Sequence, residues 1–348
     1  MAFSGRQMTE SKNSTKNGAR SQIKIVVPDE QSMVALLGSR DELLAVIERA
    51  FNSDIHVRGN EITVTGGSEP ELVARLFGEL VTLLRKGATL TPESVERSVA
   101  MLRESAVRPA EVLSHDILSS RGRTIRPKTV NQKRYVDAID QHTVVFGIGP
   151  AGTGKTYLAM AKAVKALQEK KVNRIILTRP AVEAGERLGF LPGTLYEKID
   201  PYLRPLYDAL HDMVDPGSIP QLMSAGTIEV APLAYMRGRT LNDSFIILDE
   251  AQNTSPEQMK MFLTRLGFGS KIVVTGDVTQ VDLPSGSRSG LSVVQEILQD
   301  VEDIYFCRLG SADVVRHRLV TDIVDAYERY DAAQPSEPRQ PRRERGRR

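Results

Sequence analysis

The sequence predicts an α/β protein: a doubly wound parallel sheet, preceded by a small α+β domain. Between residues 143 and 308, six short apolar segments alternate with segments of helical periodicity, which is the pattern of parallel strands joined by helices. Several of these segments are continuously apolar, as expected of strands buried on both faces. The chain has 348 residues, 41% of them hydrophobic, so its length and composition suit roughly two domains with buried cores.

The N-terminal part divides into two segments. Residues 1–22 are rich in Ser, Asn, Lys and Gly and have almost nothing to bury, so we expect them to be disordered. Residues 23–104 show the alternation and helical spacing of a small domain. Its elements are expected in the order β-α-α-β-β-α: strand 23–27, a short helix before Gly38, helix 43–51, strands 55–57 and 62–64 around a Gly59-Asn60 turn, and helix 72–84. A further helix is expected from Thr91-Pro92-Glu93 to about Glu104.

This order of elements resembles the KH fold, which contacts RNA through a GxxG loop between its first two helices. The corresponding residues here are Gly38-Ser39-Arg40-Asp41, so an acidic residue replaces the second glycine. The resemblance covers the topology and not the contact motif, and the domain is therefore a degenerate KH-like one. Two interpretations stay open: RNA binding by this domain, and a structural or protein-docking role.

Residues 105–130 are interpreted as a connector to the α/β domain, which is expected to occupy residues 131–330. Four cations near its end either contact nucleic acid or keep an exposed hairpin solvated: Arg121, Arg123, Arg126 and Lys128. The strands of the α/β domain are expected at residues 143–148, 174–178, 227–230, 245–248, 271–275 and 304–308.

Residues 331–348 are expected to form a disordered basic tail. From Ala332 onward it holds six Arg and two Glu, whereas the whole chain has a formal charge of only +2. A basic tail on a near-neutral body is compatible with nucleic-acid binding, and equally with a solubilising end.

One segment matches the phosphate-binding pattern GxxxxGK[ST] at every defined position: Gly149, Pro150, Ala151, Gly152, Thr153, Gly154, Lys155 and Thr156. It follows an expected strand and opens an expected helix, which is the context of a P-loop. Backbone N–H groups of such a loop surround phosphates, and the helix N-terminus adds partial positive charge. We expect Lys155 to reach the β- and γ-phosphates of a nucleotide and Thr156 to ligate Mg²⁺.

A second acidic motif follows the buried strand 244–248. Asp249 is suited to hold Mg²⁺ through water, and Glu250 to orient and polarise an attacking water. A glutamate after the aspartate favours hydrolysis over transfer to a bound acceptor, although an acidic pair at a strand end can also be a solvated cap. With Ala251 and Gln252 these residues form a DEAQ box, a variant found in helicase-like cores.

Two glutamines are candidate nucleotide contacts. Gln132 precedes the P-loop and resembles the adenine-reading glutamine of superfamily 1 helicases, the alternative being an ordinary surface residue. Gln280, shortly after Thr275-Gly276-Asp277, is placed to sense the γ-phosphate. The run Glu197-Lys198-Ile199-Asp200 lacks the first residue of a GTPase base reader, so ATP is the expected nucleotide.

Other residues are candidate nucleic-acid contacts. Thr178-Arg179-Pro180 follows the second strand, where helicase-like cores contact single-stranded nucleic acid. Tyr196, Tyr202 and Tyr207 lie in the next helical segment and either stack on bases or pack half-buried against the core.

Together these stretches resemble the PhoH-like ATPase family over roughly residues 20–330. They comprise residues 121–129, 149–156, 178–186, 188–193, 249–253 and Arg316-His317. The resemblance implies a P-loop NTPase with a RecA-like, helicase-like core, and a cytoplasmic bacterial ATP-binding protein connected to RNA metabolism. Some relatives carry a fused PIN-type nuclease, but the N-terminal domain here lacks the spaced acids of one.

True helicases use two RecA-like lobes, and we expect only one in this chain. We therefore expect an arginine from a neighbouring subunit to complete the site, with Arg316 as the first candidate and a surface ion pair as its alternative. An arginine finger can contribute roughly 10³–10⁵ in rate. This predicts a homo-oligomer, such as a hexameric ring.

Several classes of protein are excluded by composition. The single cysteine, Cys307, excludes an internal disulfide framework and a Cys-based zinc site, and its flanks predict a buried thiol. No segment approaches the roughly 18 apolar residues of a membrane span, and residues 1–22 lack a signal-peptide core, so a cytoplasmic protein is expected.

These motifs are compatible with three functions: an Mg²⁺-dependent ATPase that remodels RNA, an ATP-dependent switch that controls docking of a partner such as an endoribonuclease, and a small-molecule kinase. The DEAQ box argues against the kinase, and we expect the ATPase.

Overall fold

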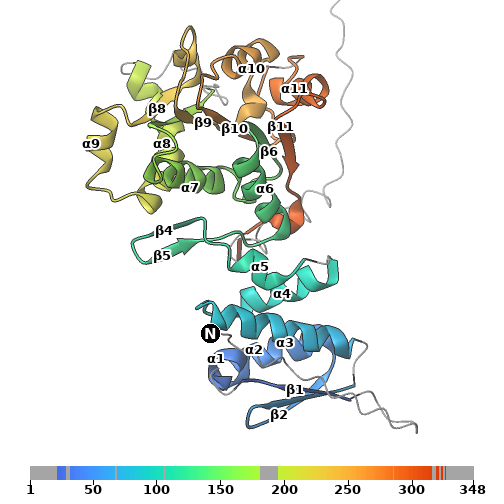
Figure 1. The fold of residues 1–348 in the computed structure, drawn as a ribbon. Coiled ribbons are helices and arrows are strands. Elements are labelled where there is room, and N and C mark those ends of the chain that lie inside the picture. Colours follow the sequence, from blue (N-terminus) through green and yellow to red (C-terminus); the bar gives the residue numbers. More distant parts are fainter. Residues whose placement is uncertain are drawn as a thin grey trace, which may run out of the picture.

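The computed structural model describes residues 22–28, 32–66, 69–104, 107–180, 195–284 and 286–315, with residues 319, 320, 323 and 326. For residues 195–200 it describes the backbone alone. Residues 1–21 of the segment predicted to be disordered (1–22), and the basic tail 331–348, lie outside these ranges. Gln22 begins the first strand, so the predicted boundary was wrong by one residue. Two domains lie one above the other, with the N-terminal domain at the bottom of Figure 1. Within the described residues, no helix is both long and apolar enough to span a bilayer.

The N-terminal domain has the predicted β-α-α-β-β-α order, followed by one more helix. Its antiparallel sheet has the order β1-β3-β2, in which β1 is Gln22–Val26, β2 is Asp54–Arg58 and β3 is Glu61–Thr65. The helices are α1 (Met33–Leu37), α2 (Glu42–Phe51), α3 (Pro70–Arg85) and α4 (Pro92–Glu104). Ile62 and Val64 of the central strand are fully buried beneath α3, because alternate residues of a strand face the same side.

The loop in the GxxG position keeps an unusual backbone without its second glycine. Gly38 has φ 83°, and Arg40 and Asp41 have φ 56° and 59°. A Cβ atom on Gly38 would lie 2.7 Å from Cγ of Glu42, so only glycine fits there. Asp is one of the few residues that adopts the left-handed region readily, so Asp41 keeps a conformation typical of glycine while presenting a carboxylate.

The segment interpreted as a connector is ordered where the structure describes it. Residues 107–130 contain helix α5 (Pro109–Leu113) and a hairpin of β4 (Leu118–Ser120) and β5 (Arg123–Ile125). Ala110 packs into the core of the N-terminal domain, whereas Ile117 and Leu118 pack into the core of the α/β domain. The segment therefore contributes to both hydrophobic cores.

The second domain is a six-stranded, all-parallel sheet. Its strands are β6 (Val144–Ile148), β7 (Arg174–Arg179), β8 (Ile228–Pro232), β9 (Ser244–Leu248), β10 (Lys271–Gly276) and β11 (Ile304–Arg308), in the order β11-β6-β10-β9-β7-β8. All six predicted strands are confirmed. The helix after β6 and the helix after the neighbouring β10 lie on opposite faces of the sheet. A topological switch point therefore lies between these two strands, and a ligand crevice is expected at their carboxyl ends.

Helices cover both faces of this sheet, so the predicted doubly wound architecture is confirmed (Figure 1). One face carries α6 (Val130–Gln141), α7 (Lys155–Gln168) and α8 (Leu195–Met213), with α9 (Ile219–Ser224) beside them. The other face carries α10 (Pro256–Leu263) and α11 (Gly290–Leu298). Successive strand residues enter opposite cores: Ile247 packs with α7 and Ile246 with α10. Cys307 of β11 is buried, which confirms the predicted buried thiol, and burial raises the pKa of this thiol to about 11.

Candidate nucleotide-binding site

A cleft of about 280 Å³ lies at the carboxyl ends of β6, β9 and β10. Its lining comes from three loops: Ala151, Gly152, Gly154, Lys155, Thr156, Tyr157, Asp249, Glu250, Gly276, Asp277 and Gln280. This is the crevice in which open α/β sheets bind ligands. The fold thus brings the two sequence motifs, which are far apart in the chain, to one place.

The phosphate-binding loop joins β6 to α7 through a tight curve. Gly152 and Gly154 have φ 85° and 77°, a region that only glycine occupies without strain. Gly149 is required for a different reason, since a Cβ atom there would lie 2.4 Å from the carbonyl oxygen of Leu309. The N–H of Gly149 donates to the carbonyl of Gly276 at 3.1 Å, so neighbouring strand ends fix where the loop begins.

Lys155 lies inside the curve of this loop. Its ammonium donates to the carbonyl oxygens of Gly149 at 2.6 Å and Pro150 at 2.8 Å. Burial lowers the pKa of the ammonium, and the carboxylates of the cleft offset part of that shift. The cation is therefore held where the loop's backbone N–H groups surround an anion.

Thr156 and Asp249 meet across the cleft. The Thr156 hydroxyl donates to Oδ1 of Asp249 at 2.6 Å, and the hydroxyl of Thr275 donates to the same oxygen at 2.8 Å. Within the described residues, no group of three or more His, Cys, Asp or Glu side chains could hold a metal ion. A hydroxyl beside one carboxylate fits Mg²⁺, which usually takes few protein ligands and completes its shell with water and phosphate oxygens.

Glu250 is held by two side chains from different elements. Its Oε1 accepts from Nη2 of Arg179 at 2.8 Å, and its Oε2 accepts from the amide of Gln252. Nη1 of Arg179 also donates to the carbonyl of Tyr202 at 2.9 Å. The backbone of Glu250 is left-handed, with φ 52°, and strained residues of this kind cluster at functional sites.

Arg179 thus has a contact that its sequence position did not indicate. It was a candidate nucleic-acid contact, yet it bonds the candidate catalytic carboxylate. Its position at the end of β7 is the only indication that the sequence offers. The two side chains are neighbours because β7 lies beside β9 in the sheet.

Gln280 lies on the wall of the cleft, next to Asp277. Its amide donates to Oδ2 of Asp277 at 2.8 Å, and the N–H of Asp277 donates to Oε1 of Gln252 at 3.0 Å. Gln252 therefore connects the carboxylate of Glu250 to the backbone of Asp277 through two hydrogen bonds. A displacement of either residue would shift the other.

Gln132 is buried beneath the loop, with 3% of its surface exposed. Its amide oxygen accepts from the N–H of Lys128 at 2.7 Å, and its amide nitrogen donates to the carbonyl of Thr153 at 3.0 Å. Gln132 thus connects the phosphate-binding loop to the backbone of the segment 126–128. Adenine recognition by Gln132 stays a prediction.

Asp313 joins the start of α6 to the turn after β11. Its carboxylate accepts from the hydroxyl of Thr129 at 2.5 Å and from the amide of Asn131 at 3.0 Å. Just beyond it, the N–H of Val315 donates to the carbonyl of Gly152 at 2.9 Å. The last described turn of the domain is thus bonded to the phosphate-binding loop.

Some predicted contacts fall outside the described residues. These are Arg316, residues 181–194 and the side chain of Tyr196. Of the other two tyrosines, Tyr207 packs against the hydrophobic core of the domain, and Tyr202 lines a second pocket with Arg179 and Glu250.

A glycine-rich strand–loop–helix with an inward lysine, facing a threonine–aspartate pair at the ends of parallel strands, defines a P-loop NTPase. The family described as "PhoH-like protein" matches residues 124–328. The chain belongs to this family.

Relatives support the same family over most of the chain. A PhoH-like protein of Mycobacterium tuberculosis strain H37Rv is 70% identical over 297 residues, covering 85% of this chain and 84% of that protein. A PhoH-like protein of Bacillus subtilis is 52% identical, with 88% and 96% covered. Protein PhoH of Escherichia coli K12 is 37% identical, with 89% and 87% covered.

Among solved structures, the Pif1 helicase of Candida albicans covers 61% of this chain and 49% of its own, at 14% identity and a TM-score of 0.31. A Sulfolobus solfataricus SWI2/SNF2 ATPase core covers 59% and 53%, at 13% identity and a TM-score of 0.33.

Proposed function

We propose that this chain is a cytoplasmic, Mg²⁺-dependent ATPase that acts on RNA and uses an arginine from a neighbouring subunit. The observation that carries the proposal is the 2.6 Å contact between Thr156 and Asp249, with Glu250 beside it and Lys155 inside the loop. These four side chains share one cleft.

Each group has a role that follows from its chemistry. The loop N–H groups and Lys155 bind the β- and γ-phosphates, and Thr156 and Asp249 hold Mg²⁺. Mg²⁺ bound there neutralises charge on the phosphate oxygens. Glu250 accepts a hydrogen bond from a water molecule and orients it toward the terminal phosphate. An ionised carboxylate has about four acceptor positions, so the bonds from Arg179 and Gln252 leave two of them for water.

ATP is the proposed nucleotide because the chain lacks the base-reading motif of GTPases at its nearest match, residues 197–200. A direct comparison of ATP and GTP turnover tests this choice. If GTP is hydrolysed with equal kcat/KM, the assignment fails, while the roles of the phosphate-binding residues stand.

The RNA role is supported by exposed cations and by topology. Arg121 and Arg123 lie on the exposed β4–β5 hairpin, and the N-terminal domain has the element order of a KH fold. Phosphate contacts by such cations are the main source of sequence-independent affinity for nucleic acid.

The proposed subunit arrangement rests on Arg316 as the first candidate for an arginine finger supplied by a neighbouring subunit. Arg316 of one subunit would contact the terminal phosphate bound by the next, as in a ring. Sedimentation and mixing experiments test it: an active but strictly monomeric protein would overturn this part.

The deciding experiment is steady-state ATP hydrolysis with Mg²⁺, with and without single-stranded RNA, on the native chain, Lys155→Ala and Glu250→Gln. We expect RNA to stimulate turnover, and each substitution to lower kcat by roughly 10²–10⁴. If turnover is lost in both variants but ignores RNA, the second function holds instead: a switch whose nucleotide state controls docking of a partner such as an endoribonuclease.

A further inference from the structure

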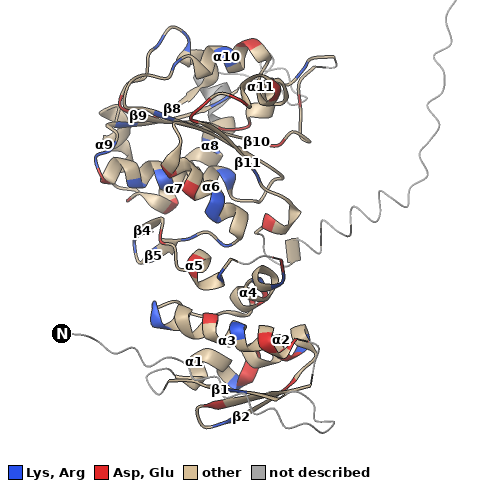
Figure 2. Ribbon diagram, turned by 45° about the vertical axis from the view of Figure 1, so that its right-hand side comes forward, with Lys and Arg blue, Asp and Glu red and all other residues tan. Residues whose placement is uncertain are grey.

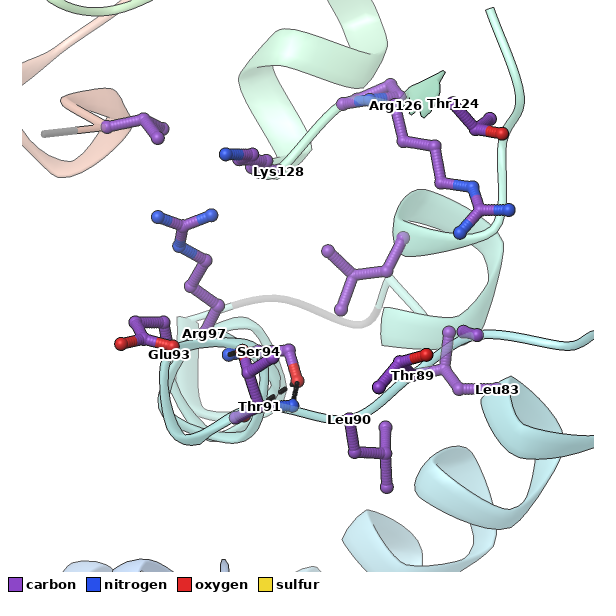
Figure 3. Close-up of a pocket in the computed structure, with 14 residues that line it drawn as sticks. Leu83, Thr89, Leu90, Thr91, Glu93, Ser94, Arg97, Thr124, Arg126 and Lys128 are labelled. Carbon is purple, nitrogen blue, oxygen red and sulfur yellow. Dashed lines mark hydrogen bonds between the residues drawn. The ribbon is translucent and has the colours of Figure 1, made fainter. Parts of the chain in front are cut away.

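A second cleft, of about 570 Å³, separates the two domains (Figure 3). The N-terminal domain contributes the end of α3 and the start of α4, the connector contributes Leu113, Thr124, Arg126, Pro127 and Lys128, and the α/β domain contributes Val315. This interdomain cleft shares no lining residue with the nucleotide cleft. The proposed nucleotide site therefore does not account for this second cleft.

Two cations face each other across the interdomain cleft. Arg97 extends from α4 and Lys128 from the segment before α6, and their charged ends point toward one another (Figure 3). Within the described part of the chain, neither charged end has a hydrogen bond or an ion pair. By contrast, Arg126 on the same wall is paired with Asp116.

Burial and mutual repulsion disfavour the charged forms of this pair. Burial lowers the pKa of Arg97, partly offset by Glu93 and Glu96, and burial together with repulsion from Arg97 lowers the pKa of Lys128, partly offset by Glu93. One carboxylate of the lining thus faces two cations. The Lys128 side chain is reached by solvent because the cleft is open, although protein atoms surround it. Elsewhere, basic and acidic residues are interspersed along the ribbon of both domains (Figure 2). Like charges brought together destabilise each other unless an opposite charge joins them.

The chemistry that fits is a phosphate group. A guanidinium and an ammonium converging from two sides match an oxyanion, and charge-assisted hydrogen bonds of this kind are roughly twice as strong as neutral ones. The rest of the lining is half apolar, including Leu83, Leu90 and Pro127, and half polar, including the carboxylate of Glu93. The apolar part can cover the uncharged part of a larger ligand.

Two hydrogen-bonded paths connect residues that line the interdomain cleft to the phosphate-binding loop. The N–H of Lys128 donates to Gln132, whose amide donates to the Thr153 carbonyl at 3.0 Å. Val315, on the same wall, donates its N–H to the Gly152 carbonyl at 2.9 Å. A shift of this wall therefore moves two carbonyls of the phosphate-binding loop.

We propose that Arg97 and Lys128 bind a phosphate group in the interdomain cleft, carried by an RNA strand or by a small phosphorylated molecule, and that Gln132 and Val315 transmit its binding to the P-loop. The phosphate site stands independently of the proposed ATPase activity. Its transmission rests on nucleotide binding at the P-loop, and by linkage each ligand then changes the affinity of the other by the same factor.

The test measures binding rather than turnover, with the full-length protein and the P-loop saturated with MgADP. The probes are a fluorescein-labelled ten-residue oligouridylate, followed by anisotropy, and inorganic phosphate, followed by calorimetry. The variants are Arg97→Gln, Lys128→Gln and the double variant. Arg58→Gln and Lys260→Gln remove the same charges at exposed positions outside the cleft, and thermal melting shows that each variant is folded.

We expect each cleft variant to weaken RNA binding about tenfold or more, with Lys128→Arg close to the native chain and both controls within twofold of it. The slope of log affinity against log salt should fall by about 0.7 for each lost contact. If only phosphate binding is lost, the ligand is a small phosphorylated molecule. If the double variant binds both probes like the controls, the site is overturned.

Transmission from the cleft to the P-loop is measured separately, as the dissociation constant of fluorescent ADP with and without the bound probe. A difference in the native chain that disappears in the double variant supports it. If no difference is seen while the cleft variants lose RNA binding, transmission is overturned and the phosphate site remains.

Discussion

The guanidinium of Arg179 donates to Oε1 of Glu250 at 2.8 Å and to the carbonyl of Tyr202 at 2.9 Å. It thereby ties the carboxylate proposed to orient water to helix α8. Because Glu250 has a left-handed backbone, its side chain depends on such contacts for its position. A movement of α8 would consequently reach the reacting end of the nucleotide through one side chain.

Replacing Arg179 should separate binding from turnover. In Arg179→Gln we expect kcat to fall about tenfold to a hundredfold while the KM for ATP changes little, because the phosphate-binding loop is untouched. Arg179→Lys should stay low as well, since one ammonium does not reproduce a planar fork that serves two acceptors. Steady-state kinetics checks this, and a large rise in KM with normal kcat would show instead that Arg179 serves binding.

Asp249→Asn should change the requirement for Mg²⁺. The amide keeps the size of the side chain but loses the charge that holds the cation, so we expect half-saturation by Mg²⁺ to rise at least about tenfold, from the loss of a charge-assisted contact. Binding of ADP without metal should change little. A magnesium titration of ATP hydrolysis measures the effect, and Asp54→Asn, on exposed strand β2, is a matched control.

Gly149→Ala should disrupt the loop through sterics alone. The new Cβ atom would meet the Leu309 carbonyl oxygen at 2.4 Å, and overpacking of this kind costs about 1–3 kcal/mol. We expect a lower melting temperature and weak ADP binding. Gly310→Ala is the control, because a Cβ atom there meets nothing within 4 Å; if both variants bind ADP normally, the close approach has no such consequence.

Cys307 should make stability depend on pH in the alkaline range. Its pKa is about 11 in the folded chain against an ordinary value of 9.0, so its contribution is fully present below about pH 9. Above that pH the unfolded chain loses the proton first, and we expect about 2–3 kcal/mol to be lost by pH 11. Urea unfolding between pH 8 and 11 measures this, and Cys307→Val should show a flatter profile.

The sequence alone was sufficient to predict the strands of the α/β domain and the phosphate-binding motif. Buried parallel strands are continuous apolar runs, and GxxxxGK[ST] is a local pattern whose geometry depends on its own residues. Lys155, Thr156, Asp249, Glu250 and Gln280 accordingly lie in one cleft.

Contacts set by strand order were not predictable in the same way. Nothing local to Arg179 indicates that β7 lies beside β9, and nothing local to Gln132 indicates that it is buried under the loop. The segment 105–130 lacks long periodicity, because its helix and two strands are only three to five residues each. Short elements of this kind take their structure from the domains on either side.

Asp313 has a consequence for how the protein is made. It joins Thr129, at the start of the domain, to the turn that reaches Gly152, and 184 residues separate Thr129 from Asp313. On the ribosome, these hydrogen bonds form only after Asp313 and Val315 have emerged from the exit tunnel. The phosphate-binding loop therefore gains its bond to this turn late in translation.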